Sequence, residues 1–127
     1  MAITLTLCAA PLSLQADLND EPRIQSGMIA LGMGNMIREN CPSISARMVR
    51  AYWYLKSLES HALDLGYSKV QIESYTDNDQ EKARLLGLAR ARLQDKGVNF
   101  DDPQTFCTVG QAEIAANSAI GRLLRAN

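Results

Sequence analysis

The sequence lacks an excess of charge of either sign and has few histidines and cysteines. Thirteen lysines and arginines face fourteen aspartates and glutamates, for a net charge of −1, so no overall field draws the chain toward nucleic acid or an anionic membrane. The single histidine, His61, and the absence of a Cys-x-x-Cys pair exclude the usual zinc sites and c-type haem attachment. Methionines at helical spacing are far more often core residues than haem ligands. We expect no cofactor, no metal and no nucleic-acid partner.

Aspartate, glutamate, lysine, arginine and histidine are absent from residues 1–16. This short apolar stretch ends in Leu14-Gln15-Ala16 and resembles the core and cleavage region of a secretory signal peptide, although the basic start of such a peptide is missing. Either the true start codon lies upstream, or the stretch is a buried N-terminal segment. It is too short to span a bilayer. We interpret residues 1–16 as a truncated signal peptide and residues 17–127 as a single helical domain that is periplasmic or secreted.

Removal of residues 1–16 also removes Cys8 and leaves two cysteines, Cys41 and Cys107. Two remaining thiols usually pair in an oxidising compartment, whereas in a cytosol they are more often inert core residues. Export and pairing therefore support each other. We predict a disulfide between Cys41 and Cys107 that ties the end of the first helix to the start of the last.

No segment alternates with a period of two over the length of a strand, so the sequence predicts an all-α fold. Capping residues and apolar spacing divide the chain into four long helices and one short one, which form a compact bundle with one disulfide. The expected caps include Ser45, a capping box of Ser68 and Gln71, and the run Asp77-Asn78-Asp79. The expected helices cover about residues 22–39, 45–66, 68–75, 77–97 and 102 to nearly the C-terminus. In the first of these, Gly27, Gly32 and Gly34 indicate close approach of a neighbour; the alternative is a kink or break near Gly32.

The second helix carries apolar residues on two sides. A stripe at spacings of three and four predicts its core face, and this stripe comprises Met48, Ala51, Leu55, Leu58, Ala62 and Leu65. Val49, Trp53 and Leu63 project from roughly the opposite side, with Ser60 among them. If the helix is central, this second side is also buried; if not, it forms a partner surface. We predict that the helix is central and that Trp53 is covered, because a helix that is apolar on two sides normally lies in the interior.

Two motifs that suggest chemistry have simpler explanations. Ser57, His61 and Asp64 carry the residue types of a hydrolytic triad at i, i+4 and i+7, but the chain contains no nucleophile elbow, so we interpret them as a polar helix face. The acidic run at residues 77–81 resembles the start of a calcium loop. Lys82 replaces its glycine and Leu88 its bidentate glutamate, and the acids are better explained as a helix start.

Several ordered residues together resemble a family. They are Asn40-Cys41, residues 44–48, Leu65-Gly66-Tyr67, Asp101-Asp102-Pro103, Cys107, Gly110 with residues 112–114, and Ser118 with residues 120–124. The chain is similar on these positions to a small uncharacterised family of exported alphaproteobacterial proteins, a domain of unknown function, over about residues 22–126. The resemblance implies a signal-bearing helical protein with two matching cysteines, and it implies no activity and no catalytic residues.

The leading hypothesis is therefore a non-catalytic periplasmic protein that binds an unknown protein or an envelope component through a helical surface, with Val49, Trp53 and Leu63 as the possible partner surface. An enzyme is the first alternative, with His61, Glu113 and Arg122 among the available groups. A carrier of an apolar ligand between helices is the second. The sequence itself names no substrate or partner.

We expect the mature protein to begin near Asp17 and to be found outside the cytoplasm. Cell fractionation combined with N-terminal sequencing measures both. A cytoplasmic product that retains Met1 would contradict export, and it would also weaken the case for the disulfide because a reducing cytosol disfavours one.

Overall fold

The computed structural model describes residues 17–127, and the predicted signal peptide lies outside these residues. The described chain is mostly helical, as predicted, with one small two-stranded sheet. Its elements are η1 (Leu18–Asp20), α1 (Pro22–Asn40), β1 (Ile44–Ala46), α2 (Met48–Asp64), α3 (Lys69–Thr76), α4 (Asp79–Asp95), α5 (Gln104–Ala115), η2 (Gly121–Leu123) and β2 (Leu124–Ala126). None of the described helices is long and apolar enough to cross a membrane.

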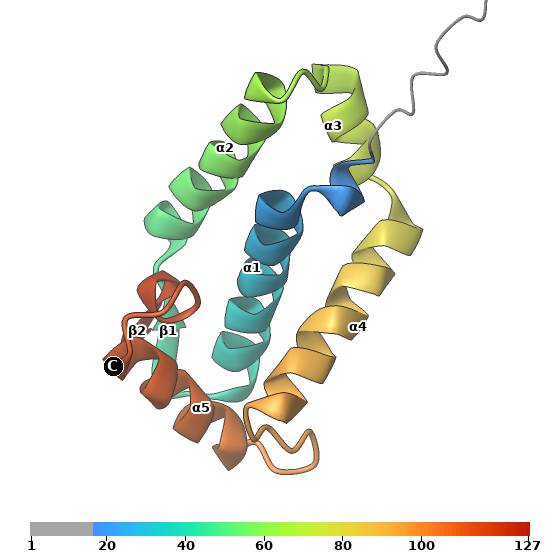
Figure 1. The fold of residues 1–127 in the computed structure, drawn as a ribbon. Coiled ribbons are helices and arrows are strands. Elements are labelled where there is room, and N and C mark those ends of the chain that lie inside the picture. The colour runs from blue at the N-terminus through green and yellow to red at the C-terminus, as the bar shows by residue number, and fades with distance from the viewer. Residues whose placement is uncertain (1–16) are drawn as a thin grey trace, which may run out of the picture.

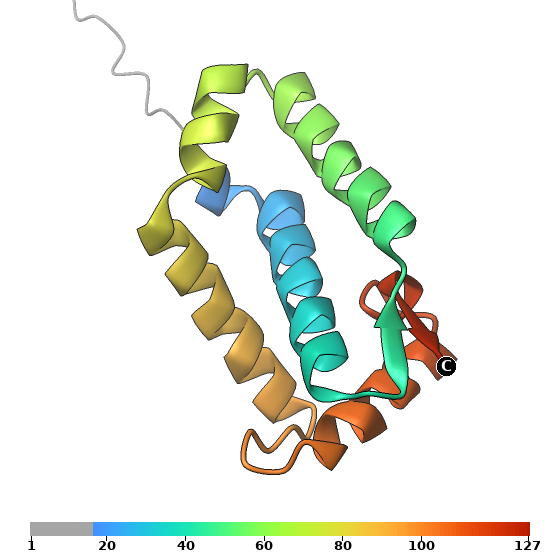
Figure 2. The same ribbon diagram turned by 180° about the vertical axis from the view of Figure 1, so that it is seen from behind.

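Helix α1 is the centre of the fold. In both ribbon views it lies between α2 and α4, while α3 joins these two helices at one end and α5 lies at the other (Figures 1 and 2). Its side chains Ile29 and Ile37 are completely buried, and Ala89 and Leu93 of α4 are buried equally deeply. The main core therefore follows α1 and is closed by α4 and α5.

The glycines of α1 permit close packing. A Cβ atom on Gly27 would stand 2.6 Å from both terminal methyl groups of Leu58, so this glycine lets α2 approach. A Cβ atom on Gly32 would stand 3.4 Å from the Cβ atom of Ala89 in α4, which is an ordinary contact distance. The alternative of a break near Gly32 is wrong, because α1 runs unbroken from Pro22 to Asn40.

Most helix ends lie where their capping residues predict. Pro22 occupies the first turn of α1. Ser68 and Gln71 form the expected capping box at the start of α3, and the Asn78 side chain accepts a hydrogen bond from the Glu81 amide at the start of α4. These local hydrogen bonds satisfy amides that have no partner inside the helix.

The structure corrects the sequence prediction at the start of α2. Ser45, the expected cap, lies instead in β1, and α2 begins at Met48 after Arg47. β1 pairs antiparallel with β2, with Ser45 opposite Arg125. The pair is extended by two backbone hydrogen bonds, from Arg47 N to Leu123 O at 2.8 Å and from Asn127 N to Ser43 O at 2.9 Å.

The last helix is also shorter than predicted. α5 ends at Ala115, and Asn117 takes a left-handed conformation with φ of 51°. Asparagine is among the few side chains that tolerate this region. The chain then turns back, and the turn is fixed by hydrogen bonds from the Ser118 amide to Glu113 O and from the Gly121 amide to Ser118 Oγ. This reversal delivers the C-terminal residues to β1.

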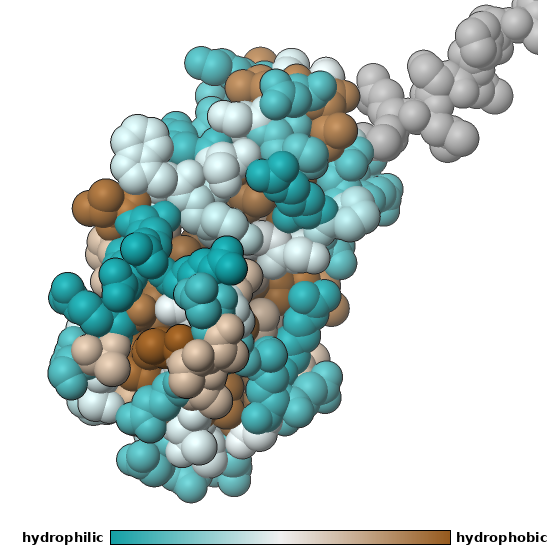
Figure 3. Space-filling model, turned by 60° about the vertical axis from the view of Figure 1, so that its left-hand side comes forward, coloured by the Kyte–Doolittle hydropathy of each residue, from teal (hydrophilic) through white to brown (hydrophobic). Residues whose placement is uncertain are grey.

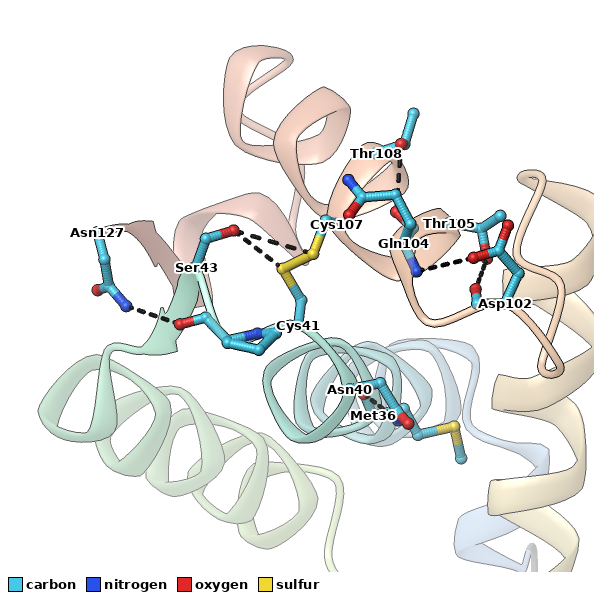
Figure 4. Close-up of a disulfide and its surroundings, with 11 residues drawn as sticks. Met36, Asn40, Cys41, Ser43, Asp102, Gln104, Thr105, Cys107, Thr108 and Asn127 are labelled. Atoms are coloured by element: carbon cyan, nitrogen blue, oxygen red, sulfur yellow. Dashed lines mark hydrogen bonds between the residues drawn. A yellow bond between two sulfur atoms is a disulfide. The ribbon is translucent and has the colours of Figure 1, made fainter.

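The predicted disulfide between Cys41 and Cys107 is present, with 5.2 Å between the two Cα atoms. It joins the segment between α1 and β1 to the first turn of α5 (Figure 4). Ser43 Oγ lies 3.2 Å from the Cys41 sulfur and 3.9 Å from that of Cys107. A bridge across a 66-residue separation stabilises a fold by about 4 kcal/mol in the chain-entropy account.

A matched pair of glycine substitutions tests how tightly the C-terminal turn is packed. A Cβ atom on Gly121 would collide with the backbone carbonyl of Glu113, whereas one on Gly87 of α4 would meet nothing within 4 Å. We expect Gly121→Ala to lower the free energy of unfolding by about 1–3 kcal/mol, which is the typical range for overpacked sites. Gly87→Ala should raise it by about 0.5–1 kcal/mol because alanine favours a helix interior. Urea titrations of the two variants measure the difference, and equal effects would contradict the packing described.

Candidate docking surface at the start of helix α2

The outer side of α2 is exposed. Val49 is 73% exposed and Trp53 is 65% exposed, so the prediction that Trp53 is covered is wrong. The reason is the position of α2, which packs along α1 on one side and has no helix on its outer side within residues 17–127 (Figure 1). The helix lies at the edge of the fold and is not sandwiched.

The predicted core stripe of α2 is only partly buried. Leu58 and Ala62 contact the core, but Met48 is 65% exposed and Leu55 and Leu65 are also exposed. The spacing is correct for one face of a helix, yet α1 covers only the middle of that face. Exposed apolar side chains therefore appear on both sides of the first half of α2.

Four neighbouring exposed side chains at the start of α2 are here named the α2 surface: Met48, Val49, Tyr52 and Trp53. The rings of Tyr52 and Trp53 contact edge to face with their centroids 5.4 Å apart. Leu63, the third residue of the predicted partner surface, is exposed as well. It lies 14 positions beyond Val49, about 21 Å along the helix axis, so the structure does not bring it into the α2 surface.

Arginines border the α2 surface. A hollow of about 550 Å³ lies beside Trp53, here named the arginine hollow. Its lining residues are Ala46, Arg47, Met48, Val49, Arg50, Trp53 and Arg125. Figure 3 shows the side of the molecule that carries α2, where apolar brown areas reach the surface between hydrophilic teal ones. The sequence alone does not predict the arginine hollow, because Arg125 reaches it only through the pairing of β2 with β1.

The neighbouring charge on α2 is paired. Lys56 Nζ lies 3.0 Å from Glu59 Oε2 and 5.8 Å from the centre of the Tyr52 ring. The hydrogen bond to Glu59, with the negative charge of that carboxylate, raises the pKa of Lys56 above its ordinary value. Lys56 therefore stays cationic at neutral pH, and its charge is offset within the helix.

The residues with triad chemistry do not assemble. Ser57 Oγ donates a hydrogen bond to the Tyr54 carbonyl at 2.6 Å, and His61 Nδ1 lies 3.4 Å from an Arg23 nitrogen. Serine and histidine are thus engaged with other groups. Among residues 17–127 no cluster of three or more histidine, cysteine or acidic side chains could hold a metal ion.

A second hollow, of about 360 Å³, lies between α1, α2 and α3. Apolar side chains dominate its lining, including Met28, Leu55 and Ile72, and Lys56 and Glu59 also contribute. Tyr75 borders it, and the Tyr75 hydroxyl is buried without a hydrogen-bond partner in the described chain. This volume is at the low end of those that hold small ligands.

Comparison with known proteins identifies a family and no individual relative. A family described as "Family of unknown function (DUF5333)" matches residues 16–125. No curated protein and no solved structure matches the chain. The resemblance to an uncharacterised family is thereby confirmed at the level of a family of unknown function, and the match spans nearly all of the described residues. The chain belongs to the DUF5333 family.

Proposed function

We propose that this protein is a non-catalytic binding protein of the periplasm, or a secreted one, that docks a partner protein through the α2 surface. The observation that carries the proposal is the exposure of Trp53, the only tryptophan in the chain, at 65%. Tryptophan and tyrosine are enriched at the centres of protein interfaces, where a large apolar ring with a polar edge is buried on binding. The disulfide is compatible with an oxidising compartment.

The energetics of the α2 surface support a docking role over a purely structural one. The side chains of Met48, Val49, Tyr52 and Trp53 are mostly exposed and lie outside the buried core of the isolated chain. Their transfer from water into an interface would gain about 25 cal/mol for each Å² of apolar area. Contiguous exposed apolar areas on soluble proteins commonly mark interaction sites.

A carrier of an apolar ligand is the second candidate, and the hollow between α1, α2 and α3 is the observation that favours it. The α2 surface favours the binding protein more strongly, because the hollow is small and has charged side chains of Lys56, Glu59 and Glu73 in its lining. These groups would be desolvated by an apolar occupant at a cost.

Replacement of Trp53 separates a docking role from a structural one. We expect Trp53→Ala to change the free energy of unfolding by less than about 1 kcal/mol, because exposed positions contribute little. A buried tryptophan would cost about 3–5 kcal/mol. Thermal melts measure the stability. Val70→Ala is the matched control, since Val70 is 70% exposed on α3 and lies outside the α2 surface.

Site-specific photo-crosslinking in the native cell tests the docking itself. A photoreactive amino acid at position 53 or 49 should give a discrete protein adduct, and the same amino acid at position 70 should give none. Equal adducts at all three positions, or none at position 53, would contradict the proposal. No adduct combined with tight binding of an apolar fluorophore would favour the carrier instead.

A further inference from the structure

The arginine hollow has a charge that the described chain does not neutralise. The ion pairs within residues 17–127 involve Lys56, Lys82, Arg84 and Lys96, and none involves an arginine of the hollow. Residues 1–16 contain no acidic side chain that could supply a partner. The first turn of α2 also contains no acidic residue, so the positive end of the helix dipole adds to the same field.

Backbone carbonyls orient two of these arginines. Arg47 Nε donates a hydrogen bond to the carbonyl of Leu124 at 3.1 Å, and an Arg50 nitrogen donates one to the carbonyl of Arg122 at 3.3 Å. A guanidinium has five N–H donors in a planar fork that matches a carboxylate. Each arginine is therefore positioned by one hydrogen bond and keeps further donors for a ligand.

Apolar contact and positive charge occur at the same place. Trp53, Met48 and Val49 line the hollow together with Arg47, Arg50 and Arg125. A protein segment that carries carboxylates and an apolar side chain within a few residues of each other matches both features. The hydrogen bonds that hold Arg47 and Arg50 reduce the entropy that these two side chains lose when such a ligand binds.

Resting on the proposed function, we infer that the partner docks an acidic segment in this hollow, with carboxylates on Arg50 and Arg125 and an apolar side chain against Trp53. A protein segment fits better than an anionic membrane, because α2 also carries the exposed Asp64 farther along. A membrane lying along α2 would repel this acid.

The probe for the experiment is a random peptide library displayed on phage. The library is selected for binding to residues 17–127 with the disulfide formed. We expect the selected peptides to be enriched in aspartate and glutamate next to an aromatic or aliphatic residue. Their affinity should fall as the salt concentration rises, because exposed charges are screened. Selection of neutral or basic peptides would overturn the inference.

Charge reversal locates the binding. Arg50→Glu/Arg125→Glu should weaken the selected peptides by at least about tenfold, and Arg50→Lys/Arg125→Lys should weaken them less because it keeps the charge and loses only the fork. Lys69→Glu is the control, since Lys69 is exposed on α3, away from the hollow, and should change affinity less than about twofold. Thermal melts establish that each variant is folded. If the glutamate variant does not fold, the lysine variant still tests whether the arginine forks contribute to peptide binding.

The outcomes also separate this inference from the proposed function. If Trp53→Ala abolishes peptide binding while Arg50→Glu/Arg125→Glu leaves it unchanged, the α2 surface docks a partner, and the inference that the partner segment is acidic is wrong. If neither variant has an effect, both proposals fail. If vesicles of phosphatidylcholine and phosphatidylglycerol bind the wild type and release the arginine variant, and the peptides do not bind, the site recognises an anionic membrane and the inference is overturned.

Discussion

The disulfide between Cys41 and Cys107 is the constraint on which the rest of the structure depends. It fixes the segment that leaves the central helix α1 to the start of α5, so that β1 starts at a defined place. α5 then leads through the turn at Asn117 to β2, which returns to pair with β1. The two strands are only three residues long each, and an isolated pair of that size is marginal in water. The strands alone would not maintain this sheet, and the covalent link holds it in place together with the burial of Ile44 and Leu124 in the core.

The candidate site follows from that sheet. Pairing of β1 with β2 brings Arg125 beside Arg47 and Arg50, which precede it by more than seventy positions. The carbonyls of the returning C-terminal segment then orient the guanidinium groups at the start of α2. The position of α2 at the edge of the fold leaves Trp53 open beside them. The disulfide thus contributes to the arginine hollow indirectly, because it helps to fix the sheet that brings Arg125 beside the start of α2.

Local signals predicted local structure, and they failed where a distant segment or a missing neighbour decided the outcome. Capping residues such as Ser68 and Asn78 act within one helical turn, and the helices they start lie where expected. The pairing of Ile44 with Ala126 depends on backbone hydrogen bonds between segments far apart in the sequence, and three residues carry too little pattern to reveal it. Periodicity correctly placed Val49 and Trp53 on one side of α2, but it cannot tell whether another helix covers that side. The arginine hollow could not be predicted, because it depends both on the pairing of β1 with β2 and on the absence, within the described chain, of a helix over that side of α2.

Amide hydrogen exchange with and without the disulfide tests most directly whether the cross-link maintains the sheet and thereby the candidate site. In the oxidised protein the amides of Arg47 and Asn127, which donate across the β1–β2 pair, should be protected. After reduction, or in a Cys41→Ala/Cys107→Ala variant, protection at these two amides should disappear. Amides in the core helices α1 and α4, such as that of Ala89, should stay protected as long as the variant is folded. Unchanged protection of Arg47 and Asn127 in a folded, reduced protein would contradict the account.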